Sequence, residues 1–274
     1  MELVIEVTDR CHNNCVHCSS NSNASKALFL PVSAIEKAIQ DVNPGTVILS
    51  GGEPFLHPKI GDIISTIKDL GIKLAVNTCG VFKPLVVPGN IDRIDEIYVS
   101  WFGERRDITR FDPPIAFMHP FGFVMNARFF GAKRMWINTV VLGAWQIVDI
   151  PEACFHAGLP VHVMRLVDHG RASDMRILPL HAQRAIATTI IDQLDPAKAS
   201  RRPPAFLCRD RQEVLPDDIE RLEAIHPLCK ASHSLFPGQC RAGEKRTLLP
   251  DGRLIGCVAG KGRDEAIGKF RACD

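Results

Sequence analysis

The sequence has no long hydrophobic run and almost no net charge. No apolar stretch approaches the ~18 residues that span a bilayer, so we expect no membrane segment. The stretch MELVIEV reads as a strand and lacks the charged region and cleavage site of a signal peptide, which predicts a cytoplasmic protein. Lys and Arg number 33 against 31 Asp and Glu, a net charge of +2, and no long basic run is present. Nucleic acid is therefore not expected as a partner.

Disulfides are not expected either, although the sequence contains ten cysteines. In a reducing compartment cysteines serve as metal ligands, catalytic thiols or buried packing residues. With 46% hydrophobic residues, the 274 residues can bury a substantial core. They suit one large α/β domain, or one domain with a small appendage.

Short β-branched apolar runs alternate with longer amphipathic segments along residues 1–200. This alternation predicts an α/β fold in which a parallel sheet curves into a partial (β/α)6 TIM-like barrel, with functional groups at the C-terminal ends of the strands. The predicted strands are 3–7, 46–50, 73–77, 96–100, 136–141 and 161–167. Ser33 and Glu36 predict a capping box at the start of the first helix. The connection DPAKASRRPPAF predicts a boundary between a barrel of residues 1–200 and a small C-terminal domain of residues 201–274.

Cys11, Cys15 and Cys18 lie within the stretch CHNNCVHC, soon after the first predicted strand. A structural zinc site closes with four ligands and disulfides use cysteines in pairs, so three thiolates leave one coordination position over. A [4Fe–4S] cube uses three cysteines for three irons and leaves the fourth iron open to a substrate or cofactor. A zinc knuckle completed by His12 or His17 is the alternative.

The spacing C-x3-C-x2-C resembles the signature of the radical S-adenosylmethionine (SAM) enzymes. In that family the open iron takes up the methionine part of SAM, and an electron from the cluster cleaves SAM to a 5′-deoxyadenosyl radical. The resemblance implies an enzyme with a [4Fe–4S] cluster, SAM and an electron donor such as flavodoxin or ferredoxin. SGGEP follows the second predicted strand and resembles the family's GGEP segment. This implies that Gly51, Gly52 and Glu53 bind the ammonium group of SAM.

Three later strand ends resemble further SAM contacts of the family. Ser100 ends the segment EIYVS, Asn138 lies in WINTVV, and Arg165 lies in VMRLV. The resemblance implies that each of them contacts SAM. The acidic residue common after the fourth strand is replaced here by Phe102.

The C-terminal segment CRAGEKRTLLPDGRLIGC predicts a β-hairpin with a Pro-Asp-Gly turn, in which Gly252 takes a positive φ. The segment resembles the opening of the SPASM and twitch domains, which add auxiliary iron–sulfur clusters to radical SAM barrels. Only the shorter twitch form fits, because the later cysteine cluster of a full SPASM domain is missing. The resemblance implies a second, auxiliary [4Fe–4S] cluster with the ligands Cys229, Cys240, Cys257 and Cys273. Cys208 in place of Cys229, or a zinc-stabilised hairpin, is the alternative.

Three cysteines remain outside the two clusters. Cys154 lies in an expected helix, which favours buried packing. Cys79 follows the third strand, where Thr-Cys-Gly replaces the family's Thr-Asn-Gly, and Cys208 lies in the segment that returns to the C-terminal unit. Cys79 and Cys208 are candidate catalytic hydrogen-atom donors to a substrate radical, and thiols without a catalytic role are the alternative.

In size, single auxiliary site and motif order, the chain is similar to radical SAM dehydrogenases and epimerases of aminoglycoside pathways. The resemblance implies hydrogen abstraction beside a hydroxyl, and then epimerisation or oxidation of the carbinol carbon of a small polar metabolite such as a sugar or aminoglycoside. Modification of a peptide is the alternative among enzymes. A non-catalytic iron–sulfur or zinc binding module is the alternative outside them, although a module without SAM has no need of SGGEP.

Overall fold

Ten strands in the described part of the chain form a single sheet. The computed structural model describes residues 1–80, 90–103, 120–201, 215–231, 235, 244–256 and 266–269, and for 120, 121 and 266–269 the backbone alone. The order across the sheet is β10-β9-β8-β1-β2-β3-β4-β5-β6-β7. The strands are β1 Glu2–Thr8, β2 Thr46–Gly51, β3 Lys73–Thr78, β4 Glu96–Ser100, β5 Met135–Val140, β6 Val161–Met164, β7 Lys230–Ala231, β8 Lys245–Leu248, β9 Arg253–Ile255 and β10 Ala266–Lys269.

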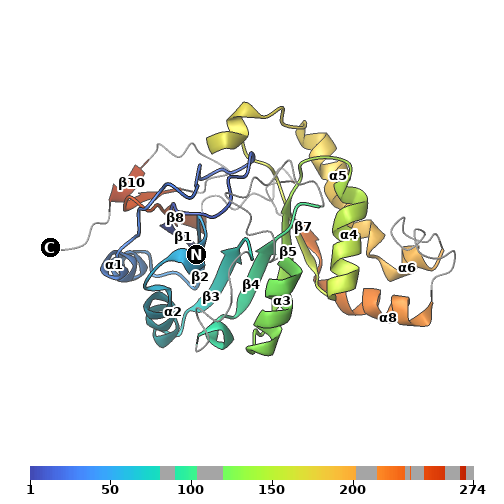
Figure 1. Cartoon of the computed structure of the whole chain (residues 1–274), viewed down its shortest axis with the longest axis horizontal. Coiled ribbons are helices and arrows are strands. Elements are labelled where there is room, and N and C mark those ends of the chain that lie inside the picture. The colour runs from blue at the N-terminus through green and yellow to red at the C-terminus, as the bar shows by residue number, and fades with distance from the viewer. Residues whose placement is uncertain are drawn as a thin grey trace.

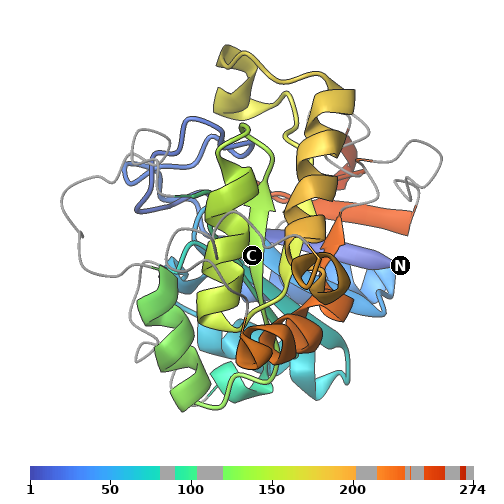
Figure 2. The same ribbon diagram turned by 90° about the vertical axis from the view of Figure 1, so that its right-hand side faces the viewer.

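The strands from β8 through β1 to β7 all run parallel, so their C-terminal ends meet at one edge of the sheet. The first six occupy the places that the apolar runs predict, and the partial TIM-like barrel is confirmed. Figures 1 and 2 show the helices around the outside of the curved sheet. The helices are α1 Val32–Val42, α2 Ile60–Asp69, α3 Pro120–Phe129, α4 Gln146–Ala157, α5 Leu180–Gln193, α6 Pro196–Ala199 and α8 Pro216–Ile225. Short 3-10 turns are η1 Pro54–Leu56, η3 Ile91–Arg93, η4 Gly170–Asp174 and η5 His226–Leu228.

The capping box predicted at the first helix is wrong. The residue that precedes α1 is Pro31, in an extended conformation, and no side chain caps the helix. Ser33 therefore already lies inside the first turn, where its side chain cannot take the N-cap position in front of Glu36.

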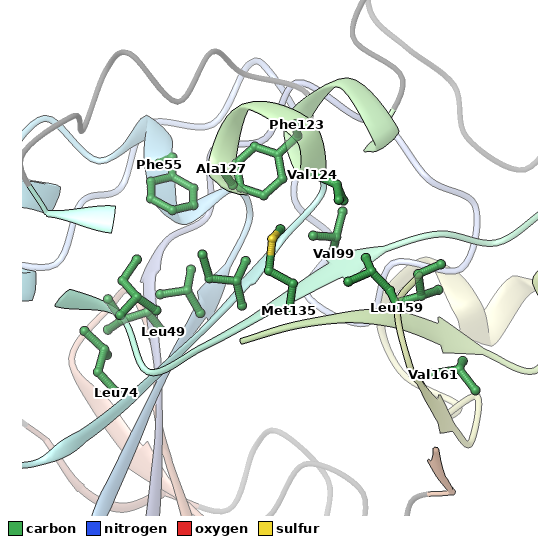
Figure 3. Packing of buried hydrophobic residues seen from close by; sticks show 14 of the residues in the cluster. Leu49, Phe55, Leu74, Val99, Phe123, Val124, Ala127, Met135, Leu159 and Val161 are labelled. Carbon is green, nitrogen blue, oxygen red and sulfur yellow. The ribbon is translucent and has the colours of Figure 1, made fainter. Parts of the chain in front are cut away.

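The outer face of the sheet packs against the helices in one large apolar core. Strand residues such as Leu49, Val99 and Met135 belong to the same apolar cluster as Phe123 of α3, and Figure 3 shows Val99 and Met135 on the side of the strands that faces α3. Phe123 is fully buried, and its ring centroid lies 6.3 Å from that of Phe55 in η1. This core fixes the sheet and leaves the chemistry to the strand ends.

The inner face of the sheet is filled at its N-terminal side. Tyr98 and Trp136 stack with ring centroids 5.8 Å apart, and Lys230 Nζ lies 4.1 Å from the Trp136 ring centroid. Lys230 donates to the Tyr98 hydroxyl (2.9 Å), which donates to Glu96 Oε2 (2.7 Å). Lys73 pairs with the same carboxylate at 3.0 Å. These side chains fill the inner face on this side among the described residues.

The C-terminal strands belong to the same sheet as the barrel. Strands β8 and β9 form the predicted antiparallel hairpin, and Gly252 has φ +81° in its turn. Strand β8 pairs with β1 in parallel, whereas β7 extends the opposite edge beside β6. The division at residue 200 stays a prediction. No helix in the described ranges is both long and apolar enough to cross a membrane.

Candidate active site

The cysteine loop, residues 9–31, leaves the C-terminal end of β1 and returns to α1. Its two ends are joined where Leu30 N–H donates to Val7 O (2.9 Å). Further along, Cys11 N–H donates to Asn23 O (3.0 Å). Figure 1 shows this loop in dark blue above the end of the sheet. The loop is therefore an ordered excursion at the edge where a barrel carries its chemistry.

The three predicted ligands lie close enough to influence one another. Asn13 N–H donates to Cys11 Sγ and Ser22 N–H donates to Cys18 Sγ, each at 3.4 Å. Burial, followed by the nearby Cys11 and Cys18 sulfurs, raises the pKa of the Cys15 thiol to about 12. Three thiolates in this loop therefore need a positively charged partner such as an iron centre.

Three polar atoms of the loop are left for a bound group. Asn13 Oδ1, His17 Nδ1 and Ser22 Oγ are buried without a hydrogen-bond partner among the described residues. A [4Fe–4S] cube takes one cysteine on each of three irons, which is the number of thiols that the loop offers. The donor set fits an iron–sulfur cluster.

The two glycines after β2 lie directly against the chain that leads into Cys11. Gly52 N–H donates to Thr8 O (2.7 Å), and Gly51 has φ +124°. A Cβ on Gly52 would lie 2.0 Å from Arg10 O, and one on Gly51 would lie 2.4 Å from Thr8 O. These glycines therefore allow a close contact with the protein's own backbone. Their role as SAM contacts stays a prediction.

Glu53 is fully buried and held in one orientation. Its Oε1 accepts from Thr78 Oγ1 (2.9 Å) and from Phe55 N–H (3.2 Å), and its Oε2 accepts from Cys79 N–H (2.7 Å). Burial raises the pKa of this carboxyl group, which the hydrogen bonds only partly offset. Such a carboxylate suits a cationic ligand group that restores the balance of charge.

Cys79 lies between the cysteine loop and Glu53. Its backbone N–H donates to Glu53 Oε2, and its thiol lies near the Cys11 thiol and the Glu53 carboxylate. The Cys11 side chain is the first cause, and burial the second, that raise the pKa of the Cys79 thiol well above its usual value. The residue that departs from the family's pattern therefore stands at the centre of the site.

The remaining predicted contacts lie along the same edge of the sheet. Ser100, the last residue of β4, and Asn138, within β5, are register partners. Asn138 Oδ1 lies 3.1 Å from His162 Nδ1 of β6. Arg165 follows β6, and its buried Nε has no hydrogen-bond partner among the described residues. Ser100 and Arg165 thus lie at C-terminal strand ends, whereas Asn138 lies within β5 and contacts His162.

Two contacts of the cysteine loop are not predicted by any motif in the sequence. Arg171 of η4 hydrogen-bonds to several residues of the cysteine loop. His17 packs edge-on against Phe102, with ring centroids 4.2 Å apart, so the residue that replaces an acid after β4 packs against the loop. Burial, with the Arg171 charge second, lowers the pKa of His17 to about 4 and keeps it neutral.

The predicted auxiliary ligands are described only in part. Cys229 directly precedes β7, which lies at the end of the sheet order opposite to β8. Its Sγ donates to Ile225 O (3.4 Å), and burial raises its pKa to about 11. The Cys154 thiol is fully buried and lies near the Cys229 thiol, as expected of a packing residue. The other residues of this prediction lie outside the described ranges: Cys208, Cys240, Cys257 and Cys273.

Curated proteins similar in sequence cover most of the chain. The probable GTP 3′,8-cyclase of Methanothermobacter thermautotrophicus is 24% identical over 270 residues, which is 94% of this chain and 84% of that protein. The 7-carboxy-7-deazaguanine synthase of Hyperthermus butylicus is 24% identical over 188 residues, 64% of this chain and 73% of the relative. Both identities are low.

Solved structures share the fold. SuiB of Streptococcus suis, bound to the precursor peptide SuiA, superposes with a TM-score of 0.68 at 16% identity and covers 98% of this chain. This chain spans 62% of the length of SuiB. The anSMEcpe structure with bound AdoMet and a peptide gives a TM-score of 0.63 at 12% identity, with coverage of 98% of this chain and 76% of that one.

The family model that matches the chain covers the part that builds the site. Residues 5–103 match the model of the Radical SAM superfamily. This range holds the cysteine loop, the Gly-Gly-Glu turn and Cys79. Over this range the chain is similar to the radical SAM superfamily, and the solved structures share its fold.

Proposed function

We propose that this chain binds a [4Fe–4S] cluster through Cys11, Cys15 and Cys18, and SAM beside it. The observation that carries the proposal is that these three thiols and the buried carboxylate of Glu53 meet at the C-terminal edge of the sheet. When bound, the two groups supply a 5′-deoxyadenosyl radical that removes hydrogen from a C–H bond. The protein supplies the binding, the orientation and the electrostatics.

Glu53 is the residue proposed to fix the ammonium group of SAM. Three donors orient its carboxylate, and no solvent reaches it. Ser100, Asn138 and Arg165 are proposed to make further contacts with SAM from the ends of β4 to β6. The buried Nε of Arg165 has no hydrogen-bond partner among the described residues, which supports the proposed contact of Arg165 with SAM.

The substrate is proposed to be a small polar metabolite whose carbinol carbon is epimerised or oxidised. Sugars and aminoglycosides fit this class. The relatives named for GTP cyclisation and for a deazaguanine product favour a small molecule over a peptide and add purine nucleotides to the class. A peptide substrate is the second candidate, because SuiB with its precursor peptide shares the fold over 98% of this chain.

An auxiliary [4Fe–4S] cluster in a twitch-like C-terminal unit is also part of the proposal. The confirmed hairpin of β8 and β9 supports it, because Cys240 precedes the hairpin and Cys257 follows it in the sequence. Cys240, Cys257 and Cys273 would be ligands, with Cys229 or Cys208 as the fourth.

The replacement Glu53→Gln tests SAM binding. Loss of one partner from a buried charge pair costs about 2–5 kcal/mol, which corresponds to a loss of SAM affinity of roughly 30-fold or more. We expect reconstituted wild-type protein with a strong reductant to cleave SAM to 5′-deoxyadenosine and methionine. The variant should keep its iron and need far more SAM. Product formation is measured by chromatography over a range of SAM concentrations.

Glu36→Gln on the exposed face of α1 is the matched control and should behave as wild type. If fully reconstituted wild-type protein forms no deoxyadenosine, even with substrates of the proposed class, the non-catalytic binding module becomes the better interpretation. Equal SAM dependence of Glu53→Gln and wild type would remove Glu53 from the site.

A single turnover in D₂O separates epimerase from dehydrogenase. A thiol S–H is weak enough to donate hydrogen to a carbon radical, so an epimerase holding Cys79 opposite the substrate should introduce one solvent deuterium. We expect this label to disappear in Cys79→Ala while deoxyadenosine still forms. Cys208→Ala is the parallel variant for the second candidate donor. Mass spectrometry of the product reads the label, and an unlabelled product two hydrogens lighter from all three proteins identifies a dehydrogenase.

A further inference from the structure

The connection after β6 holds the cysteine loop through a single residue, Arg171. Its Nε donates to Cys15 O (2.8 Å), its Nη2 to Ser22 O (2.7 Å) and its Nη1 to Asn21 Oδ1 (3.1 Å). Its backbone N–H donates to Cys18 O (3.0 Å). One residue thus meets the loop at both of its later cysteines and at the turn that follows them. Figure 1 shows the yellow segment after β6 above the same edge of the sheet as the dark-blue loop.

We propose that Arg171 is a positioning residue that holds the cysteine loop in its cluster-binding shape and raises the reduction potential of the cluster. This rests on the proposed function only in that Cys11, Cys15 and Cys18 hold a cluster. It needs neither SAM nor a particular substrate. Arg171 itself touches the loop backbone and not the reacting atoms.

The shape of the loop depends on these hydrogen bonds because it contains no helix or strand between β1 and α1. Its carbonyl groups therefore need partners from elsewhere in the fold. A guanidinium offers five donors in a rigid planar fork, whereas a lysine ammonium is a single point on a flexible chain. The fork of Arg171 reaches Cys15 O and Ser22 O together, on either side of Cys18.

Gly170 allows Arg171 to come this close. It has φ +61°, and a Cβ at this position would lie 2.5 Å from Cys18 O and 2.7 Å from Ser19 O. Both contacts are to backbone, which cannot move aside without moving the cysteine loop. The Gly-Arg pair is therefore built against the loop rather than being an incidental neighbour.

The charge of Arg171 acts on the electron that the cluster accepts. Its guanidinium hydrogen-bonds to the carbonyl oxygens of Cys15 and Ser22, in a partly buried position. A fixed positive charge against the cysteine loop stabilises the negative charge that the cluster gains on reduction. The reduction potential of an iron–sulfur cluster depends on its net charge and on its surroundings. Removal of the charge should lower the potential.

The test compares Arg171→Gln, Arg171→Lys and Arg176→Gln in reconstituted, SAM-free protein. We measure the rate of iron loss to a chelator and the midpoint potential of the cluster followed by electron paramagnetic resonance. Loss of a partner that orients metal ligands commonly weakens metal binding about 10–100-fold. We expect iron loss faster by about that factor in Arg171→Gln, together with a lower potential. Arg171→Lys should lose iron several-fold faster and keep a potential close to wild type, because it keeps the charge but not the fork.

Arg176→Gln is the matched control, since Arg176 is exposed in the same connection and should give wild-type values. Thermal unfolding of the metal-free proteins separates a folding defect from the proposed role. If Arg171→Gln does not fold, Arg171→Lys decides on iron retention. Wild-type iron retention in Arg171→Lys, or equal retention and potential in Arg171→Gln and Arg176→Gln, would overturn the proposal. Because no SAM is present, failure of the proposed reaction cannot be mistaken for failure of this inference.

Discussion

Replacement of Cys11, Cys15 and Cys18 together by alanine is expected to remove one four-iron cluster and to abolish SAM cleavage. Each of the three thiolates would ligate a separate iron, so no partial site remains to hold the cube. With the proposed auxiliary cluster in place, anaerobically reconstituted wild type should contain roughly eight irons per chain and the triple variant roughly four. Iron analysis, absorbance spectra and deoxyadenosine formation are the measurements.

The fold should survive this change. Cys11, Cys15 and Cys18 do not belong to the apolar core between the sheet and the helices, and the ends of their loop are held by backbone hydrogen bonds such as Leu30 N–H to Val7 O. Cys154→Ala is the matched control, because this buried thiol packs against the core and should leave both iron and cleavage unchanged. A folded triple variant that still holds eight irons contradicts the site. A wild type with zinc, or with four irons that the triple variant loses, contradicts the auxiliary cluster alone.

Much of the barrel could be predicted because its signals are local. Each β-branched run became a parallel strand, and the apolar spacing of Ile60, Ile63, Ile64 and Ile67 became the buried face of α2. The Pro-Asp-Gly turn fixed the hairpin because Gly252 takes the positive φ that the turn requires. The capping box failed because Pro31, with its fixed φ, places the start of α1 ahead of Ser33.

The arrangement within the site was harder to predict because its contacts join distant segments. Arg171 and Cys15 are separated by 156 positions, and no periodicity links them. Cys79 was expected at the mouth of the barrel, but a strand end alone does not indicate that its thiol meets both Cys11 and Glu53. The sequence predicted which residue types gather at this edge. The folded chain determines which of them touch.

The replacement Gly52→Ala is expected to be the most damaging single methyl group in the site. Its Cβ would lie 2.0 Å from Arg10 O and 2.5 Å from Arg10 C, distances that no side-chain rotation relieves because both atoms are backbone. Overpacking of this kind costs about 1–3 kcal/mol and occasionally more. We expect the free energy of unfolding, measured by urea titration, to fall by an amount near or above the top of that range.

The damage should extend to the cluster, because the displaced atoms directly precede Cys11. Gly52 N–H and Glu53 N–H donate to Thr8 O (2.7 Å) and Arg10 O (2.8 Å), so a shift at Gly52 moves the loop and the carboxylate together. Gly45→Ala is the matched control: no atom lies within 4 Å of a Cβ there and its φ is not positive. Glycine to alanine at such a site is neutral or stabilises by about 0.4–1 kcal/mol. If Gly52→Ala unfolds within about 0.5 kcal/mol of Gly45→Ala and holds the same iron, the close approach of the glycine turn to the cysteine loop is wrong.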